Sequence, residues 1–387
     1  MSDQLPVWAE IDLSAIAHNC REVRRSIPQK SRFMAVVKAN AYGHGAAVVA
    51  RTALANGADS LAVARIDEAL ALRRAGITAP ILVFGPIPVS RLPEAVEWDL
   101  ILTIHDIHAA KEASRLAQFL GLTLKAHLKV DTGMGRLGLV AVPEASRGRS
   151  FAPQAAEDAA TICRLPHLDI QGVYTHFAQA DSADKAYTES QLACFLAFLN
   201  HLEIQGIRFP LRHAANSAAV IDVPAAHLDL VRPGLMLYGI YPSPEVDHQS
   251  IRLKPAMSLK CRITQIKDVA PGFKISYGST FQTIQPTRIA TVPVGYADGY
   301  SRTLSSRAEM LVRGKRAPVV GRICMDQTML DVGHVEGASV GDGVLIFGGQ
   351  SPTGIPVEEI AEACSTIPYE TVASLAARVP RVYSHES

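Results

Sequence analysis

Residues 33–45 have the sequence Phe33-Met-Ala-Val-Val-Lys38-Ala-Asn-Ala-Tyr42-Gly-His-Gly45, and this stretch indicates how the chain folds. A short apolar run, typical of a buried strand, stops at a lysine and is followed by a turn with two glycines. Apolar residues at consecutive positions are typical of a strand in a parallel sheet that helices cover on both faces.

The same pattern recurs outward from this stretch, over residues 32–234, where short apolar runs alternate with Ala- and Leu-rich helical segments. Helices are expected between the apolar runs, for example at 67–74 and 190–202. Strands are expected at 33–37, 60–64, 81–84, 100–104, 124–130, 170–175, 211–214 and 228–231. These βα units predict a (β/α)₈ barrel of the TIM type.

The composition changes after Tyr241-Pro-Ser-Pro244, where β-branched residues, Gly and Pro alternate over residues 263–347. This second part predicts a mainly β domain. The expected fold is therefore α/β, with an N-terminal (β/α)₈ barrel at residues 10–240 followed by a mainly β C-terminal domain at 241–387. Residues 1–9 can pack with the second domain, and residues 142–154, rich in Pro, Ser and Arg, are expected to form a surface loop.

Charge and composition favour a small-molecule substrate. Among 387 residues, 38 Lys and Arg balance 37 Asp and Glu, so no charge excess points to nucleic acid or to an anionic membrane surface. No apolar stretch is long enough to span a bilayer and the first residues do not resemble a signal peptide, so we expect a cytoplasmic protein. The six cysteines are scattered, which argues against a metal site or a disulfide framework.

Polar residues follow the predicted barrel strands at their carboxyl ends. Lys38 follows the first strand, Lys129 ends the fifth, and His176 ends the sixth. The seventh strand continues into His213-Ala-Ala-Asn216-Ser217, and the eighth into Arg232-Pro-Gly234. Active sites of such barrels lie at this end, with phosphate often bound after strands seven and eight. The sequence therefore predicts an active site at the barrel mouth.

Further motifs occur in order along the chain: Lys129-Val-Asp-Thr-Gly-Met-Gly-Arg136, Ile275-Ser-Tyr277-Gly278, Val294-Gly-Tyr-Ala-Asp-Gly299, Arg322-Ile-Cys-Met325-Asp326-Gln327 and Pro368-Tyr369-Glu370. Each motif is modest alone, but their joint occurrence is specific. With Lys38 and its surroundings, they resemble the alanine racemases, pyridoxal-phosphate enzymes of fold type III, over nearly the whole chain.

The resemblance implies that pyridoxal phosphate is held as a Schiff base on Lys38. It also implies interconversion of L- and D-alanine, an isomerase reaction that supplies D-alanine for the peptidoglycan of the cell wall. Burial near an apolar barrel mouth lowers the pKa of a lysine, so that it can form an imine and exchange protons. Racemisation needs acid/base groups on both faces of a planar carbanion. The resemblance assigns one face to Lys38 and the other to Tyr277, contributed by the second subunit of a homodimer with shared active sites.

The same resemblance assigns Arg232 to the pyridine nitrogen of the cofactor. Because an arginine stays protonated, it should keep that nitrogen unprotonated and make the cofactor a weaker electron sink. The cofactor phosphate is expected near hydroxyl and backbone donors, with an asparagine in support: Tyr42, Ser217, Gly234, Tyr369 and Asn216.

Other residues are similar to groups that orient the cofactor or bind the substrate. His176 and Arg136 resemble residues that orient the cofactor ring and Tyr277, with Arg136 also near the substrate. Met325 resembles the residue whose backbone amide binds the substrate carboxylate across the dimer interface, and Asp326 is expected to hold that loop.

Lys129 corresponds to a position that is often a carbamylated lysine in the family. An unmodified ammonium beside Arg136 would repel it, especially away from water, whereas a carbamate would hold it. We therefore expect carbamylation of Lys129.

Three alternatives remain. A decarboxylase of the same architecture would have an acidic residue at the pyridine nitrogen where this chain has Arg232. A noncatalytic cofactor carrier would not need the extension after Tyr241. The third is a racemase of broader specificity, with serine as the nearest competing substrate, because pocket shape excludes one added hydroxyl only weakly, by about 100-fold.

Overall fold

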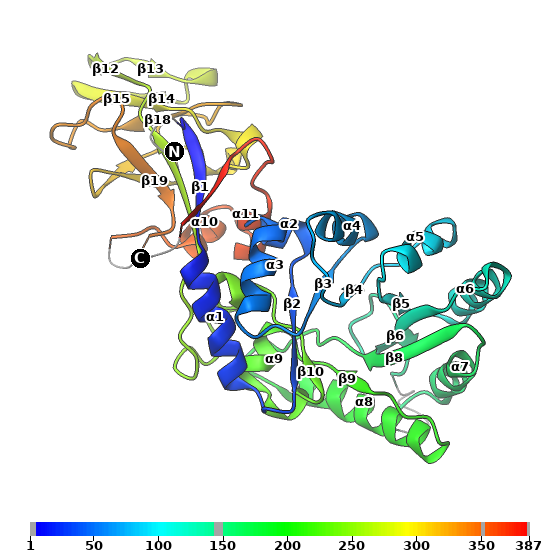
Figure 1. Cartoon of the computed structure of the whole chain (residues 1–387). Coiled ribbons are helices and arrows are strands. Elements are labelled where there is room, and N and C mark those ends of the chain that lie inside the picture. Colours follow the sequence, from blue (N-terminus) through cyan, green and yellow to red (C-terminus); the bar gives the residue numbers. More distant parts are fainter. Residues whose placement is uncertain (1–4, 143–149, 350–352, 385–387) are drawn as a thin grey trace. The chain divides into compact units, whose positions relative to one another are not determined.

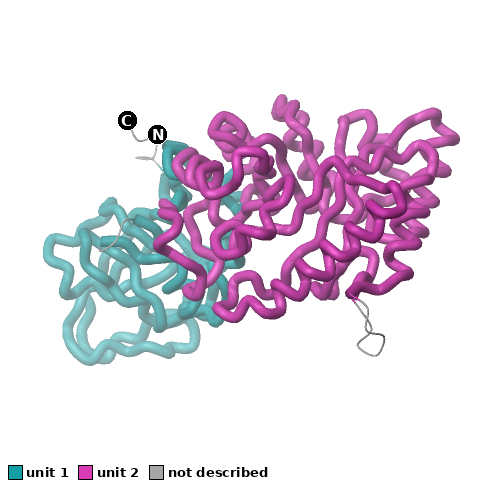
Figure 2. The backbone as a smooth tube through the Cα atoms, turned by 90° about the horizontal axis from the view of Figure 1, so that it is seen from below, with its two compact units in different colours: residues 1–15, 42–45, 255–387 teal, residues 16–41, 46–254 magenta. Residues whose placement is uncertain are grey.

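The computed structural model describes residues 5–142, 150–349 and 353–384. The chain forms two compact units, which Figure 2 shows in different colours. Unit 1 comprises residues 1–15, 42–45 and 255–387, and unit 2 comprises residues 16–41 and 46–254. The domain boundary predicted at residues 240/241 stays a prediction.

Unit 2 contains the predicted barrel, and each predicted strand overlaps an observed one. The strands are β2 (Arg32–Val36), β3 (Ser60–Val63), β4 (Ile81–Val83), β5 (Leu102–Ile104), β6 (Leu124–Asp131), β8 (Leu168–Tyr174), β9 (Leu211–His213) and β10 (Leu230–Val231). All of them pair in parallel, in the orders β10-β2-β3-β4 and β5-β6-β8-β9, while the short β7 (Leu139–Val140) pairs with β6.

Two sets of backbone contacts join these strand groups into a closed barrel. A parallel bridge connects Leu82 to Ile101, between β4 and β5. On the other side, the Asp229 N–H donates to the Arg212 carbonyl at 3.1 Å, and the Arg232 N–H donates to the Ala215 carbonyl at 2.9 Å. Strands such as β3 are buried along their full length, because the interior and the surrounding helices cover both faces.

Helices lie around the outside of these strands (Figure 1). They are α1 (Leu13–Ser26), whose first residues belong to unit 1, α3 (Ala46–Ala55), α4 (Ile66–Arg74), α5 (Leu92–Glu97), α6 (Ile107–Leu120), α7 (Pro153–Cys163), α8 (Ala186–Ile204) and α9 (Ser217–Asp222). The loop expected at residues 142–154 ends before residue 153 in the structure, because α7 begins at Pro153. Proline fits the first turn of a helix because its missing N–H has no helical partner there. Residues 143–149 of that loop lie outside the described residues.

Unit 1 is mainly β, as predicted. Its six-stranded sheet has the order β17-β16-β19-β11-β1-β20, beside a three-stranded sheet β12-β15-β18 and the hairpin β13-β14. The bounds are β1 (Val7–Asp12), β11 (Met257–Arg262), β12 (Gln265–Val269), β13 (Lys274–Ile275), β14 (Phe281–Gln282), β15 (Thr287–Val292), β16 (Glu309–Val312), β17 (Lys315–Pro318), β18 (Thr328–Asp331), β19 (Gly343–Phe347) and β20 (Arg381–Ser384), with helices α10 (Val357–Ala363) and α11 (Pro368–Ala373).

The N-terminal strand is part of the large sheet of unit 1. β1 pairs antiparallel with β11 and parallel with β20, so strands from both ends of the sequence meet there. Along β11, Met257, Leu259 and Cys261 are buried and alternate with half-buried residues, the pattern of an antiparallel strand with one covered face.

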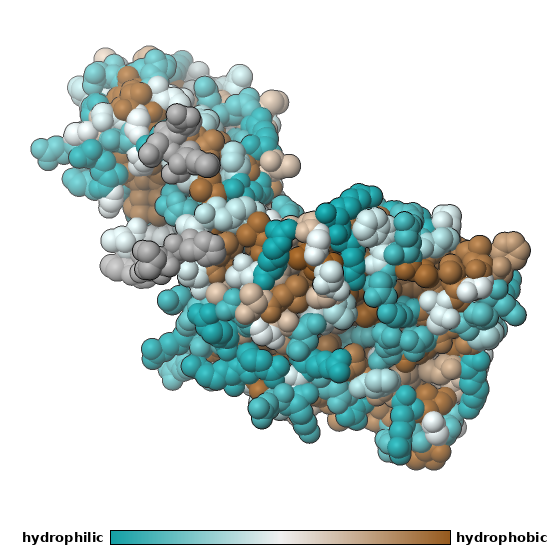
Figure 3. Space-filling view, viewed as in Figure 1, coloured by the Kyte–Doolittle hydropathy of each residue, from teal (hydrophilic) through white to brown (hydrophobic). Residues whose placement is uncertain are grey.

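Polar side chains dominate the surface seen in Figure 3, with apolar patches among them. Within the described ranges, no helix is long and apolar enough to cross a membrane.

Candidate active site

Five of the predicted site residues come from the carboxyl ends of different barrel strands. Lys38 lies two residues after β2, His176 two residues after β8, and Arg232 directly after β10. Lys129 lies near the carboxyl end of β6, and Ser217 is the first residue of α9, which follows β9. Parallel strands direct these ends to the same mouth of a barrel.

Lys38 is half-buried and begins an unusual turn, α2 (Lys38–Tyr42). Ala39, Asn40, Ala41 and Tyr42 all have φ between 51° and 54°, the left-handed region. Burial lowers the pKa of the Lys38 ammonium, the positive charge of Arg136 lowers it further, and the negative charge of Glu68 opposes both effects. The net lowering of the pKa makes the neutral amine, which is the form that attacks a carbonyl group, more accessible than in a solvated lysine.

Arg232 is buried, and its guanidinium is held by contacts on two nitrogens. Nη2 donates to the carbonyl oxygens of Thr175 at 2.8 Å and Ala214 at 3.0 Å, and to Nδ1 of His176 at 3.3 Å. Nη1 donates to Nδ1 of His213 at 2.9 Å. Burial lowers the pKa of Arg232 to about 10, so the side chain is still a cation at neutral pH.

Two buried histidines extend this contact across the barrel interior. Nε2 of His213 lies 2.9 Å from Nδ1 of His127. Since the guanidinium has only donors, His213 accepts at Nδ1, carries its proton on Nε2 and donates it to His127. Burial, followed by the charge of Arg232, lowers the pKa of His213 well below its usual range and the pKa of His127 to about 4. Both rings are therefore neutral.

Lys129 is also buried, and its ammonium donates to the carbonyl of Val130 at 2.7 Å. The ring of Tyr174 lies beneath it, with the centroid 5.3 Å from Nζ. Burial and the charge of Arg232 lower the pKa of Lys129 to about 7, against a raising effect of Asp131. About half of such amines are neutral at pH 7, and the neutral amine is the form that reacts with carbon dioxide.

Asp131 shapes the loop that carries Arg136. Its Oδ1 accepts the backbone N–H groups of Gly133, Met134 and Gly135, and its Oδ2 accepts that of Arg136 at 3.1 Å. The Arg136 side chain is exposed in this chain, and its charge lowers the pKa of Lys38, His176 and Lys129. The loop thus holds a cation close to the barrel mouth.

Hydroxyl and amide groups gather where α9 begins. The Ser217 hydroxyl accepts the backbone N–H of Gly234 at 2.9 Å and lies 3.4 Å from that of Met236. Asn216 caps α9 by accepting the Ala219 N–H at 3.0 Å. Backbone amides and a hydroxyl at a barrel mouth are donors that suit a phosphate group. This donor set therefore fits the phosphate of pyridoxal phosphate.

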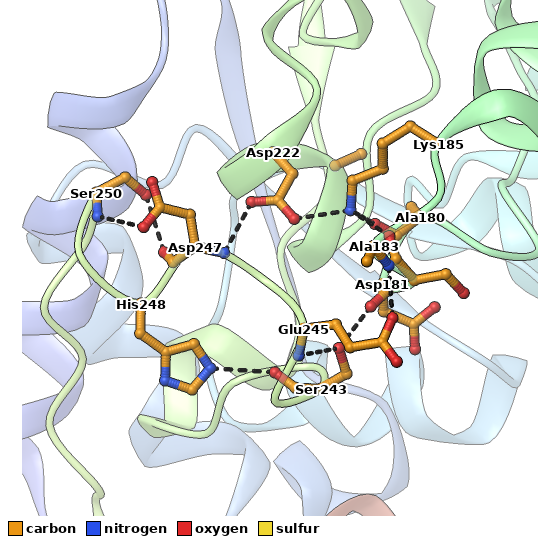
Figure 4. A network of polar contacts seen from close by, with 12 residues as sticks. Ala180, Asp181, Ala183, Lys185, Asp222, Ser243, Glu245, Asp247, His248 and Ser250 are labelled. Carbon is orange, nitrogen blue, oxygen red and sulfur yellow. Dashed lines mark hydrogen bonds and ion pairs between the residues drawn. The ribbon is translucent and has the colours of Figure 1, made fainter.

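A salt bridge ties α9 to the loop that follows His176 (Figure 4). The Lys185 ammonium contacts a carboxylate oxygen of Asp222 at 2.8 Å and donates to the carbonyls of Ala180 and Ser182. The other Asp222 oxygen accepts the Asp247 N–H at 3.0 Å. The side chains of Lys185 and Asp222 are only 20% and 10% exposed, so the pair lies largely out of solvent.

Unit 1 contains the remaining predicted residues. Tyr42 is buried, and its ring centroid lies 6.1 Å from that of Tyr369 in α11. Burial raises the pKa of the Tyr42 phenol, so it stays protonated and can donate a hydrogen bond.

Tyr277 and Met325 line one groove of unit 1, about 950 Å³ in volume, together with Asp326 and Cys324. Tyr277 and Met325 are 70% and 53% exposed, so both present apolar surface to this groove. Ser276, directly before Tyr277, has φ of 65°, and its hydroxyl donates to the Arg322 carbonyl. The segment of Tyr277 is therefore fixed to the segment of Met325.

The motif at residues 294–299, which includes Gly295, makes backbone hydrogen bonds to the loop that contains Cys324 and Met325. The N–H groups of Tyr296 and Ala297 donate to the carbonyls of Cys324 and Met325 at 3.1 and 3.0 Å. A Cβ atom on Gly295 would lie 2.3 Å from the Cys324 oxygen and 2.4 Å from the Met325 oxygen. Only glycine permits this approach.

Asp326 pairs with Arg378, whose Nη2 lies 2.8 Å from Oδ1 of Asp326. Arg378 also contacts Asp298 at 2.7 Å, so one arginine connects the two loops.

Sequence reasoning missed His127, His213 as a partner of Arg232, the Lys185–Asp222 pair, and Glu68. The only available signal was the alternation of His127 with Lys129 on one predicted strand, which places both side chains on one face. Among the described residues, no group of three or more His, Cys, Asp or Glu side chains could hold a metal ion.

Comparison with known proteins follows the two-part fold. Residues 11–242 match the family model for the alanine racemase N-terminal domain, and residues 256–383 match that for the C-terminal domain. An alanine racemase of Desulforamulus reducens is 52% identical over 380 residues, covering 98% of this chain and 99% of the relative.

Solved structures of alanine racemases are also similar to this chain over nearly its whole length. Alanine racemase of Clostridium difficile superposes with a TM-score of 0.92 at 36% identity, covering 99% of this chain and 96% of that one. The Bacillus anthracis enzyme with bound L-Ala-P gives 0.87 at 41% identity, covering 98% and 95%.

Proposed function

Because this chain belongs to the alanine racemase family, we propose that it interconverts L- and D-alanine with pyridoxal phosphate held on Lys38. The family match over both parts of the chain is the observation that supports the reaction and the cofactor. The lowered pKa of Lys38 supports its role as the lysine that binds the cofactor. In this family D-alanine supplies peptidoglycan synthesis, and we infer a cytoplasmic location for the enzyme.

The cofactor, when bound, stabilises negative charge on the substrate α-carbon. Ser217 and the Gly234 amide are the proposed phosphate donors, helped by the hydroxyls of Tyr42 and Tyr369. Asn216 keeps α9 in place through its cap.

Arg232 is the proposed partner of the pyridine nitrogen. As a buried cation it donates a hydrogen bond and supplies no proton, so the nitrogen stays unprotonated and the electron sink is weak. A weak sink favours simple return of the α-proton over bond cleavages such as decarboxylation. This argues against a decarboxylase, in which an acidic residue would occupy the position of Arg232.

Lys38 and Tyr277 are the proposed bases. Lys38 removes or returns the α-proton on one face, and Tyr277 of the partner subunit acts on the opposite face. The exposure of Tyr277 and Met325 in one groove of unit 1 supports a homodimer in which a second copy covers them.

Six residues are proposed to orient these groups or to hold the residues that do. His176 accepts from Arg232 and stays neutral, and Arg136, held by a carbamate on Lys129, orients Tyr277 and the substrate. The Met325 amide is proposed to bind the substrate carboxylate, with Asp326 and Arg378 holding the loop.

The decisive experiment is a chiral assay of the purified chain loaded with pyridoxal phosphate, started from either alanine enantiomer. Both reactions should approach equal amounts of the two enantiomers. L- and D-serine assayed in parallel determine substrate breadth. Release of carbon dioxide from amino acids without racemisation would contradict the proposal.

A further inference from the structure

The carboxylate of Glu68, in the first turn of α4, makes two separate sets of contacts. Its Oε2 accepts the backbone N–H groups of Ala64 at 2.8 Å and Arg65 at 3.0 Å, which caps the helix. Its Oε1 accepts the N–H of Ala39 at 2.6 Å. Capping alone would need only the first oxygen, and the second contacts the residue next to Lys38.

Ala39 is also the first residue of the left-handed turn. For residues other than glycine this conformation is unfavourable because Cβ approaches the following carbonyl oxygen, so four in succession need strong external contacts. At one end of the turn Glu68 holds the Ala39 N–H, and the Asn40 side chain accepts the Ala46 N–H at 2.9 Å. These contacts determine where the chain leaves Lys38.

The two charged side chains that act on the pKa of Lys38 come from different parts of unit 2. Arg136 of the β6–α7 segment lowers the pKa of Lys38, and Glu68 of α4 raises it. His176, after β8, is neutral because burial and nearby cations lower its own pKa. Glu68 is thus the acidic side chain whose charge counteracts the effects of burial and of Arg136 on the pKa of Lys38.

We propose that Glu68 is a positioning residue for Lys38, clamping the start of the left-handed turn and placing a negative charge beside the lysine. This inference rests on the proposed function, in which Lys38 binds the cofactor. Glu68 has no direct contact with substrate in this account, because both of its oxygens are bound to backbone N–H groups.

The test follows cofactor uptake by the full-length chain freed of cofactor. Stopped-flow absorbance gives the rate with pyridoxal phosphate at each pH, and peptide mapping after borohydride reduction identifies the modified lysine. Wild type is compared with Glu68→Gln and Glu68→Ala. Glu94→Gln is the matched control, since Glu94 lies in the first turn of α5 and pairs with Arg91.

Both Glu68 variants should move the pH midpoint of uptake to lower values, because the lysine loses its neighbouring negative charge and deprotonates more easily. Glu68→Ala should also lower the limiting rate at high pH about tenfold, since the turn loses its clamp. Glu68→Gln, which can still accept one hydrogen bond, should recover part of that loss. Glu94→Gln should match wild type.

An unchanged midpoint in Glu68→Gln, with only a lower melting temperature, would reduce Glu68 to a helix cap and overturn the inference. If wild type itself forms its adduct on a lysine other than Lys38, the proposed function fails instead. The two failures are therefore distinguishable.

Discussion

Replacing Gly295 by alanine tests whether the Met325 loop binds substrate. The new Cβ would lie 2.3 Å from the Cys324 oxygen and 2.4 Å from the Met325 oxygen. A carbon and a carbonyl oxygen approach no closer than about 3.3 Å, so the loop must move by about 1 Å. Overpacking of this size destabilises a protein by about 1–3 kcal/mol.

The expected effect on activity is larger than the effect on folding. Misplacing a positioning group by about 1 Å can lower the rate about 100-fold. Because the Met325 amide is proposed to bind the alanine carboxylate, Gly295→Ala should lower kcat/KM by that order in both directions. Cofactor content should stay normal, since Lys38, Ser217 and Gly234 belong to unit 2. The atoms nearest to the added Cβ belong to Cys324 and Met325, and neither is a proposed phosphate donor.

The assay combines chiral kinetics, cofactor absorbance and thermal unfolding. Gly343→Ala is the matched control, because Gly343 lies in β19 of the same unit and an added Cβ meets nothing within 4 Å. A folded Gly295→Ala variant with wild-type kcat/KM would refute the role of the loop. Loss of cofactor from that variant would show that the substitution acts elsewhere.

Three further predictions concern single side chains. Lys129 should carry added carbon dioxide, detectable by ¹³C NMR with labelled bicarbonate, and the carbamate should decrease below pH 7, because a pKa of about 7 leaves about a tenth of the amine neutral at pH 6. Tyr277→Phe should abolish most racemisation while keeping the cofactor. Mixing this variant with Lys38→Ala should restore partial activity, because each heterodimer then has one site with both native residues. If heterodimers form but stay inactive, although the two wild-type sites are shown to work independently, the shared site is contradicted. Lys185→Met should speed cofactor release several-fold, because Lys185 ties α9 to the loop after His176 through the largely buried Asp222. It should also lower the melting temperature more than the control Lys125→Met, whose partner Asp99 is 67% exposed. Equal effects of the two substitutions would argue against this role of Lys185.

The barrel could be predicted because its signal is local. Each buried parallel strand is a short apolar run, and each run is visible without knowing its neighbours. The positions of Lys38 and Arg232 followed from the same pattern, since both come directly after such runs. The boundary at Pro153 was missed because proline usually marks a loop, although it also fits a first helical turn.

The supporting contacts could not be predicted, because they join residues far apart in sequence. His127 and His213 are separated by 86 positions and meet only when β6 and β9 enter the same barrel. Glu68 has the sequence signature of a helix cap, and nothing local reveals that its other oxygen binds Ala39. The left-handed turn is also hidden, since alanine and tyrosine normally avoid that conformation.

The direction of the hydrogen bonds around Arg232 indicates which groups can transfer protons. His213 and His176 both face guanidinium donors through Nδ1, so a proton on either Nδ1 would place two N–H groups against each other beside a buried cation. Burial and that cation lower the pKa of both rings well below the usual range, which keeps them neutral. Neither histidine is therefore suited to act as a proton donor at neutral pH. This agrees with the two bases proposed above. Lys38 has a lowered pKa, which makes its neutral amine more accessible, and Tyr277 is the proposed base for the opposite face.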